Sequence, residues 1–187
     1  MDFSCYPGGV AEIEINRAPF LTLWASVVGR RLGYAEDEAL TLGRAVAGLT
    51  AQSKGRRLGV YTPNSAEERE KLLDKREEIG AETVKMMGRT IACVRTAGGL
   101  RALNKLSPAE PASVRKYLAA RFKDDLLLVE SKLVELAATF EPEELDREAM
   151  NVYMHLRPNV PKGREGWGKV GLFDTDRIDA LIRRRVG

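Results

Sequence analysis

The residues best suited to chemistry are the cations between Arg89 and Lys123. This segment holds eight lysines and arginines against the single acid Glu110, a net charge of +7. Guanidinium and ammonium groups are the side chains that hold phosphate oxygens in proteins. The predicted phosphate contacts are Arg95, Arg101, Lys105, Arg115, Lys116 and Arg121. A second, smaller basic patch is predicted at Lys54, Arg56 and Arg57.

These cations could instead pair with an acidic segment directly downstream. Between Asp124 and Glu148 there are nine acids against Lys132 and Arg147, a net charge of −7. The formal charge of the whole chain, +3, is therefore a sum over blocks of opposite sign. Either the basic segment stays open to an outside polyanion, or the downstream acids neutralise it within the fold.

The other chemically distinctive residues are few. His155 is the only histidine, and its place near a predicted helix end favours an interaction with terminal carbonyls. Cys5 and Cys93 stand far apart in no metal-ligand pattern, and Cys93 is expected to be buried. Trp167, between two glycines, is expected to pack against a core edge, with stacking or partner binding as the alternative. No catalytic residue, metal site or cofactor is predicted, because no nucleophile elbow, phosphate loop or zinc motif occurs.

Helical periodicity dominates the elements that must position these residues. A first helix is predicted from Pro19 to Leu32, with Phe20, Trp24, Val27 and Val28 on one face and Gly33 as terminator. A second helix begins near Asp37, and its small residues Ala39, Gly43 and Ala47 could admit another helix closely. Ser65 and Glu68 form a capping box for a highly charged third helix with one thin buried stripe.

The second half of the chain continues the helical pattern. Helices are predicted from Pro111 to Phe122, over 126–140 as the most buried helix, from Pro142 to Leu156, and after Asp174. Residues 157–168 are predicted to be a loop because of their prolines and glycines.

Strands are predicted in three short segments. The alternation over 10–16 suits a strand or an extended arm, and 58–62 and 89–96 are expected to pair as a two-stranded ribbon. Residues 100–105 are predicted to form one or two helical turns. Those turns, the helix from Pro111 and the ribbon would together resemble the parts of a winged-helix module.

The fold prediction is therefore mainly α: a single helical domain over 1–187 with a small two-stranded β element, α+β being the alternative. Within it, an N-terminal helical hairpin over 18–53 and a C-terminal loop plus helix over 157–187 are expected. No secretory signal and no apolar run of bilayer-spanning length occur, so the expected location is the cytoplasm, without a membrane partner.

Several phrases of the sequence resemble a group of uncharacterised conserved bacterial proteins. They are Leu21–Trp24, Gly43–Leu49, Ser53–Gly59, Arg157–Gly168 and Asp174–Ile178. The resemblance covers most of the chain and implies a bacterial cytoplasmic protein, but it carries over no activity and no binding residue.

Three classes of function follow from these observations. The leading hypothesis is a non-enzymatic, nucleic-acid-associated or regulatory protein that uses the basic segment 89–123. The alternative is a protein-interaction or self-associating module that uses the small-residue row of the second helix and the charged segments. A third hypothesis is an enzyme of unidentified class that uses His155 or the Trp167 loop.

Overall fold

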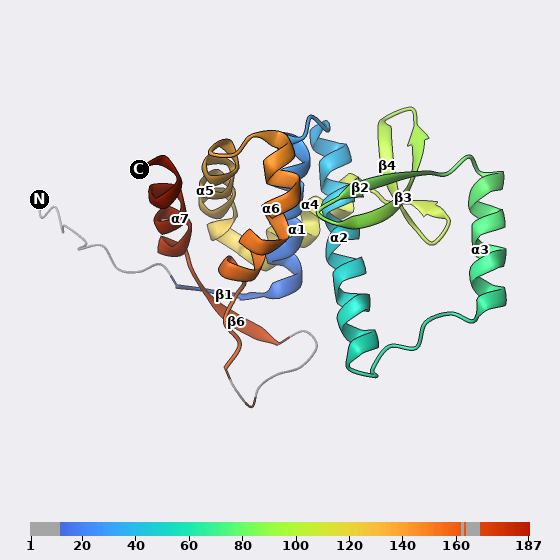
Figure 1. The fold of residues 1–187 in the computed structure, drawn as a ribbon, viewed down its shortest axis with the longest axis horizontal. Coiled ribbons are helices and arrows are strands. Elements are labelled where there is room, and N and C mark those ends of the chain that lie inside the picture. The colour runs from blue at the N-terminus through green and yellow to red at the C-terminus, as the bar shows by residue number, and fades with distance from the viewer. Residues whose placement is uncertain (1–11, 162, 164–168) are drawn as a thin grey trace, which may run out of the picture.

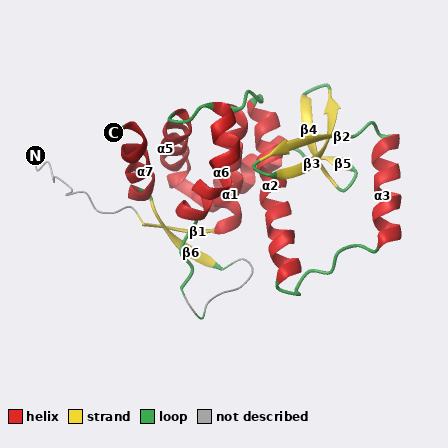
Figure 2. Cartoon of the chain, viewed as in Figure 1, coloured by secondary structure: helices red, strands yellow, loops and turns green. Residues whose placement is uncertain are grey.

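The computed structural model describes residues 12–161, 163 and 169–187, which form helices and two small antiparallel sheets (Figures 1 and 2). The helices are α1 (Arg17–Arg31), α2 (Glu36–Arg57), α3 (Ala66–Glu78), α4 (Pro111–Phe122), α5 (Leu126–Ala138), α6 (Pro142–Leu156) and α7 (Asp176–Val186). The strands are β1 (Glu12–Asn16), β2 (Glu82–Met86), β3 (Arg89–Thr96), β4 (Gly99–Asn104), β5 (Ser107–Pro108) and β6 (Val170–Asp174). The mainly helical character is confirmed, but the β component exceeds the predicted ribbon, so the fold is mixed α+β.

Helix α1 lies at the centre of the helical part, with α2, α4, α5 and α6 around it (Figure 1). Every residue from Pro19 to Gly29 is buried. The indole Nε1–H of Trp24 donates to the Ala149 carbonyl of α6 at 2.8 Å, so the only polar atom of this buried ring is satisfied. The prediction that the helix over 126–140 is the most buried is wrong. Helix α5 packs through one face only and leaves Leu127 79% exposed.

Helices α1 and α2 form the predicted N-terminal hairpin, turning at Gly33 with φ of +99°. The small-residue row of α2 faces α1. Ala39 and Ala47 are almost fully buried, and Gly43 lies against Ser26 of α1. The hypothesis that this row binds a partner is therefore wrong, because α1 of the same chain already covers it.

Strand β3 has the predicted bounds, but its neighbours differ from the prediction. It pairs with β2 and β4 in a sheet of order β2-β3-β4-β5. Residues 58–62 form no strand, because Val60 N–H and Tyr61 N–H both donate to the Gly55 carbonyl and close the end of α2. The helical turns predicted over 100–105 are strand β4, whose Leu100, Arg101 and Ala102 are buried.

Helix α3 stands apart from the helical part, at the far side of the larger sheet (Figure 1). Its capping box is confirmed: Glu68 N–H donates to Ser65 Oγ at 3.1 Å, and Ser65 N–H donates to Glu68 Oε2 at 2.8 Å. The prediction of a thin buried stripe on this helix is wrong, because no residue of α3 is buried.

The C-terminal segment contains a strand that the sequence analysis did not predict. Strand β6 pairs antiparallel with β1, placing Phe173 opposite Ile13, and the Phe173 ring lies 4.5 Å from that of Phe20. The strand predicted over 10–16 is thus confirmed for Glu12–Asn16. Cys5 and Trp167 lie outside the described residues. Among the helices that the structure describes, none has the length and apolar character needed to cross a bilayer.

Candidate functional site

The six predicted phosphate contacts are spread over β3, β4, the turn after β4 and α4, and only Arg101 and Arg115 meet, at Asp37. Arg95 is on β3, Arg101 is on β4, Lys105 follows β4, and the other three are on α4. No helix precedes α4 directly, because β4 and β5 occupy that place. The predicted winged-helix arrangement is therefore absent between Gly99 and Phe122.

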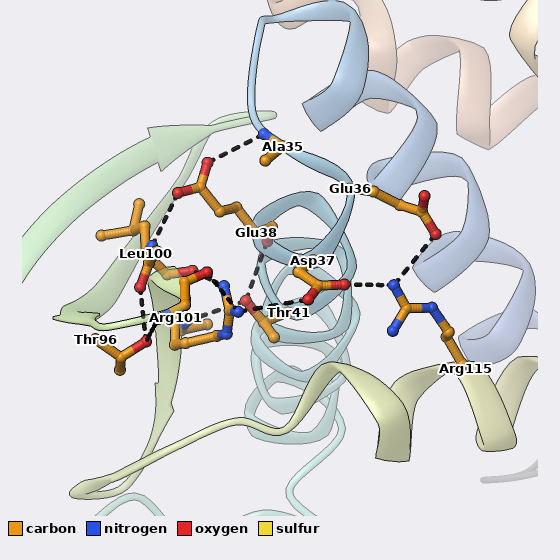
Figure 3. Close-up of polar contacts among 12 residues, drawn as sticks. Ala35, Glu36, Asp37, Glu38, Thr41, Thr96, Leu100, Arg101 and Arg115 are labelled. Carbon is orange, nitrogen blue, oxygen red and sulfur yellow. Dashed lines mark hydrogen bonds and ion pairs between the residues drawn. The ribbon is translucent and has the colours of Figure 1, made fainter.

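Arg101 is held inside the fold (Figure 3). Its side chain is only 8% exposed. Nη1 donates to the Leu100 carbonyl at 2.9 Å, Nη2 donates to the Gly98 carbonyl at 2.7 Å, and Nη2 lies 3.6 Å from Asp37 Oδ2. This guanidinium thus links α2 to the larger sheet.

Two further members of the set also contact carboxylates of the protein. Arg115 donates to Asp37 and, at 3.3 Å, to Glu36 Oε1, and its hydrogen bond to Asp37 raises the pKa of the guanidinium (Figure 3). Arg95 Nε lies 3.1 Å from Glu82 Oε1 in an exposed pair that solvent weakens.

These partners are not the acids of the downstream segment that the alternative hypothesis proposed. Within that segment, Glu130 pairs with Arg30 at 2.6 Å, and Glu144 pairs with Arg185 at 3.0 Å.

The first turn of α2 clamps this helix to β4. Glu38 Oε1 accepts from Leu100 N–H at 2.8 Å and Oε2 accepts from Ala35 N–H at 3.0 Å (Figure 3). These bonds, the one from Leu100 first, lower the pKa of Glu38. Thr41 Oγ1 accepts from Ala102 N–H at 3.2 Å. A surface hollow of about 400 Å³ beside this clamp carries both charge signs, since acids and arginines line it together.

A second hollow, of about 260 Å³, lies between α2 and the turn that joins β2 to β3. It is lined by Leu49, Gln52, Ser53, Arg56, Gly88, Arg89 and Thr90. Two guanidinium groups, two hydroxyls and one amide supply hydrogen-bond donors, and no lining residue is a carboxylate. This hollow is therefore suited to an anion.

Local backbone structure explains how these residues meet. Helix α2 runs to Arg57, beyond the predicted hairpin limit at 53, so the predicted patch Lys54, Arg56 and Arg57 forms its last turn. The β2–β3 turn has positive φ at Met87 and Gly88, and Met87 N–H donates to Asp146 Oδ1 at 2.7 Å. Arg89, the residue after this turn, is thereby placed beside α2.

The dipole of a helix end does not explain the surroundings of the Arg89 side chain. Cations in a last helical turn, such as Arg56, are stabilised by the helix dipole whether or not a ligand binds. Arg89 is not on that helix. Its Nε is buried and has no hydrogen-bond acceptor in the part of the chain that the structure describes. Buried polar atoms without a partner are rare, and the described residues hold three others, Arg31 Nε, Thr50 Oγ1 and Arg177 Nη1.

Sequence reasoning counted Arg89 in the basic segment but did not select it as a contact. The missed signal was the strand Glu82–Met86, which follows a charged helix and ends at Met87-Gly88. Once that strand is recognised, Met87-Gly88 becomes a hairpin turn and Arg89 becomes a turn-flanking residue.

The remaining cations of the predicted set are on the surface. Lys105, Lys116 and Arg121 contact no carboxylate among the residues that the structure covers. The Arg121 guanidinium lies 5.8 Å from the Tyr117 ring centroid, and that of Arg44 lies 4.2 Å from it.

The surroundings of His155 and Cys93 indicate structural roles. His155 lies in the last turn of α6 as predicted, and its Nδ1–H donates at 2.8 Å to the carbonyl of Asn151, one turn earlier in the same helix rather than to a terminal carbonyl. Cys93 is buried as predicted, and burial raises the pKa of its thiol to about 11. The described ranges hold no group of side chains arranged as a metal site.

Comparisons of this chain with protein-family models, curated proteins and solved structures each gave no match. The bacterial resemblance and the location in the cytoplasm therefore stay predictions.

Proposed function

We propose that this chain is a non-enzymatic nucleic-acid-binding protein whose hollow between α2 and the β2–β3 turn holds backbone phosphate. One observation carries the proposal: Arg56 and Arg89 line a hollow that no carboxylate enters. Guanidinium groups match the geometry of phosphate oxygens, and the hydroxyl of Ser53 and Thr90 can donate to further oxygens.

A polymer fits this surface better than a single nucleotide. Lys54 and Arg57 are exposed outside the hollow, in the same helical turn as Arg56. Farther along the chain, Lys116 and Arg121 of α4 are exposed and, from the originally predicted set, remain available for peripheral contacts. Lys54 and Arg57 would contact neighbouring phosphates of a polymer, whereas a mononucleotide would use the hollow alone.

The salt dependence of binding tests the proposal. Fluorescence anisotropy with labelled DNA and RNA should show affinity that falls roughly tenfold or more between about 50 and 200 mM salt. Arg56→Gln and Arg89→Gln should each weaken binding and reduce the slope of log affinity against log salt by about 1.

The matched control removes the same charge at a remote place. Arg184→Gln lies on α7, at the opposite side of the molecule from the larger sheet (Figure 1), and its slope should equal that of the wild type. Absence of binding at low salt, or an equal effect of all three variants, would refute a phosphate site at this hollow.

A second candidate function is self-association through α3. It retains the hypothesis of a self-associating module but places the interface on α3 instead of the small-residue row of α2. Leu73 of α3 is 61% exposed, and Ile79 at the end of this helix is 43% exposed. A lone helix of this length is marginally stable in water, so burial against a second copy would stabilise it. Light scattering should then show a dimer that Leu73→Glu dissociates; a concentration-independent monomer would dismiss this candidate.

A further inference from the structure

Two exposed apolar side chains follow the last turn of α2, the turn that carries Arg56 of the hollow. Leu58 is 59% exposed and Val60 is 73% exposed, and both belong to the loop 58–65 that follows the last turn of α2. Phosphate contacts alone do not need such residues. Single exposed apolar side chains are common on protein surfaces, but beside a cation they can contact a ligand that has apolar surface as well as charge.

Tyr61 of the same loop is fixed to the end of α2. Its N–H and that of Val60 donate to the Gly55 carbonyl at 3.2 and 3.0 Å. The Tyr61 Cβ lies only 2.8 Å from where a Cβ on Gly55 would stand, so the glycine allows this close approach. The ring centroid is 5.8 Å from the guanidinium carbon of Arg56. An aromatic ring is thus held beside one wall of the hollow.

Nucleic acids differ in whether they can use such a ring. A duplex presents phosphates outward and stacks its base faces on one another, so an aromatic side chain outside the grooves finds no base face. A single strand offers both phosphates and unstacked bases, and proteins bind it with cations that follow the backbone and aromatic rings on which bases stack.

From this arrangement we infer that the ligand is single-stranded nucleic acid, with phosphate in the hollow and a base against Tyr61 and Val60. This inference rests on the proposed function and adds the strandedness of the ligand.

An anionic membrane surface also combines negative charge with apolar groups, but the geometry favours nucleic acid. A bilayer is broad and contacts what projects from a protein. Arg89 lines a hollow and is only partly exposed. A single phosphate group on a flexible strand can enter that hollow, whereas the packed headgroups of a bilayer cannot enter it.

The experiment compares a labelled oligothymidine strand with a duplex of the same length at one salt concentration. The wild type should prefer the single strand by roughly tenfold. Tyr61→Leu should lower single-strand affinity by about 5- to 100-fold while leaving duplex affinity and the salt slope unchanged, and Tyr61→Phe should keep wild-type binding. Val60→Ser, at a position too exposed to affect folding, should weaken single-strand binding several-fold.

The outcomes separate this inference from the function on which it rests. Equal affinity for strand and duplex, with the Arg56→Gln effect intact, would overturn the inference and leave phosphate binding standing. Binding to vesicles of phosphatidylcholine and phosphatidylserine without a single-strand preference would replace it with a membrane surface. No binding to any nucleic acid would overturn both. A loss of single-strand affinity in Tyr61→Phe would show that the hydroxyl, not stacking, is responsible.

Discussion

Gly43 of α2 lies against Ser26 of α1 so closely that a Cβ at position 43 would stand 2.7 Å from the Ser26 backbone nitrogen. The same Cβ would stand 2.7 Å from the Thr22 carbonyl oxygen. Both neighbours are backbone atoms in the buried part of α1, so they cannot move aside cheaply. The spacing between the two central helices is therefore set by the absence of a side chain at position 43.

Gly43→Ala should destabilise the protein. The added methyl group forces α1 and α2 apart, at a cost of about 1–3 kcal/mol in the free energy of unfolding. Gly48→Ala is the control on the same helix, because nothing lies within 4 Å of its Cβ position. Alanine has the higher helix propensity, so this variant should gain about 0.5–1 kcal/mol. Urea unfolding measures both, and changes of the same sign would contradict the packing described.

Arg101→Met should affect stability rather than ligand binding. Removing the buried guanidinium leaves the Leu100 and Gly98 carbonyls without this donor, at a cost of about 2–4 kcal/mol in unfolding free energy. Lys105→Met, an exposed cation just beyond the same strand, should change stability by less than about 0.5 kcal/mol. If Arg101→Met were as stable as the wild type but failed to bind DNA, Arg101 would be a phosphate contact after all.

Local sequence signals predicted the helices well, and the reason is physical. Gly33, Pro111, Pro142 and the Ser65–Glu68 box each act within a few residues, so the ends they specify do not depend on the rest of the fold. Strand pairing, in contrast, does depend on the rest of the fold. Val170–Asp174 is a strand because Ile13 and its neighbours, far away in the chain, supply the hydrogen-bonding edge. The apolar residues 58–62 have no such edge and stay a loop.

The candidate site shows the same limit. Charge counting found the basic segment, but it could not tell that Arg101 is buried while Arg89 reaches a hollow. That difference arises from strand register: β4 lies against α2, whereas Arg89 follows a turn anchored by Asp146. The partners of Arg115 come from the first turn of α2, at positions 36 and 37, which sequence proximity did not suggest.

Glu38→Gln should remove a contribution to stability that depends on pH. In the folded state the Leu100 and Ala35 N–H groups stabilise the carboxylate and lower the pKa of Glu38. The unfolded chain therefore takes up the proton first as the pH falls. The contribution of Glu38 is complete above the ordinary glutamate pKa and is lost as the pH falls through the lowered, folded value.

The test compares unfolding free energies at neutral pH and in acid. The wild type should exceed Glu38→Gln by roughly 1 kcal/mol at neutral pH, and the difference should shrink in acid. Glu70→Gln, on the exposed helix α3, is the control variant and should lie close to the wild type throughout. A Glu38→Gln deficit that grows in acid would contradict the sign of the shift.

Cys93 should be unreactive until the protein unfolds. Burial, and secondarily the charge of Glu82, raise the pKa of this thiol to about 11, and the thiolate is the reactive form. In a Cys5→Ser background, Ellman's reagent at about pH 8 should react with native protein at least a hundredfold more slowly than with urea-unfolded protein. The unfolded thiol ionises first as the pH rises, so stability should also fall above the ordinary cysteine pKa and level off near 11. Rapid labelling of the native protein, unaffected by urea, would show that β3 does not hold Cys93 inside the sheet.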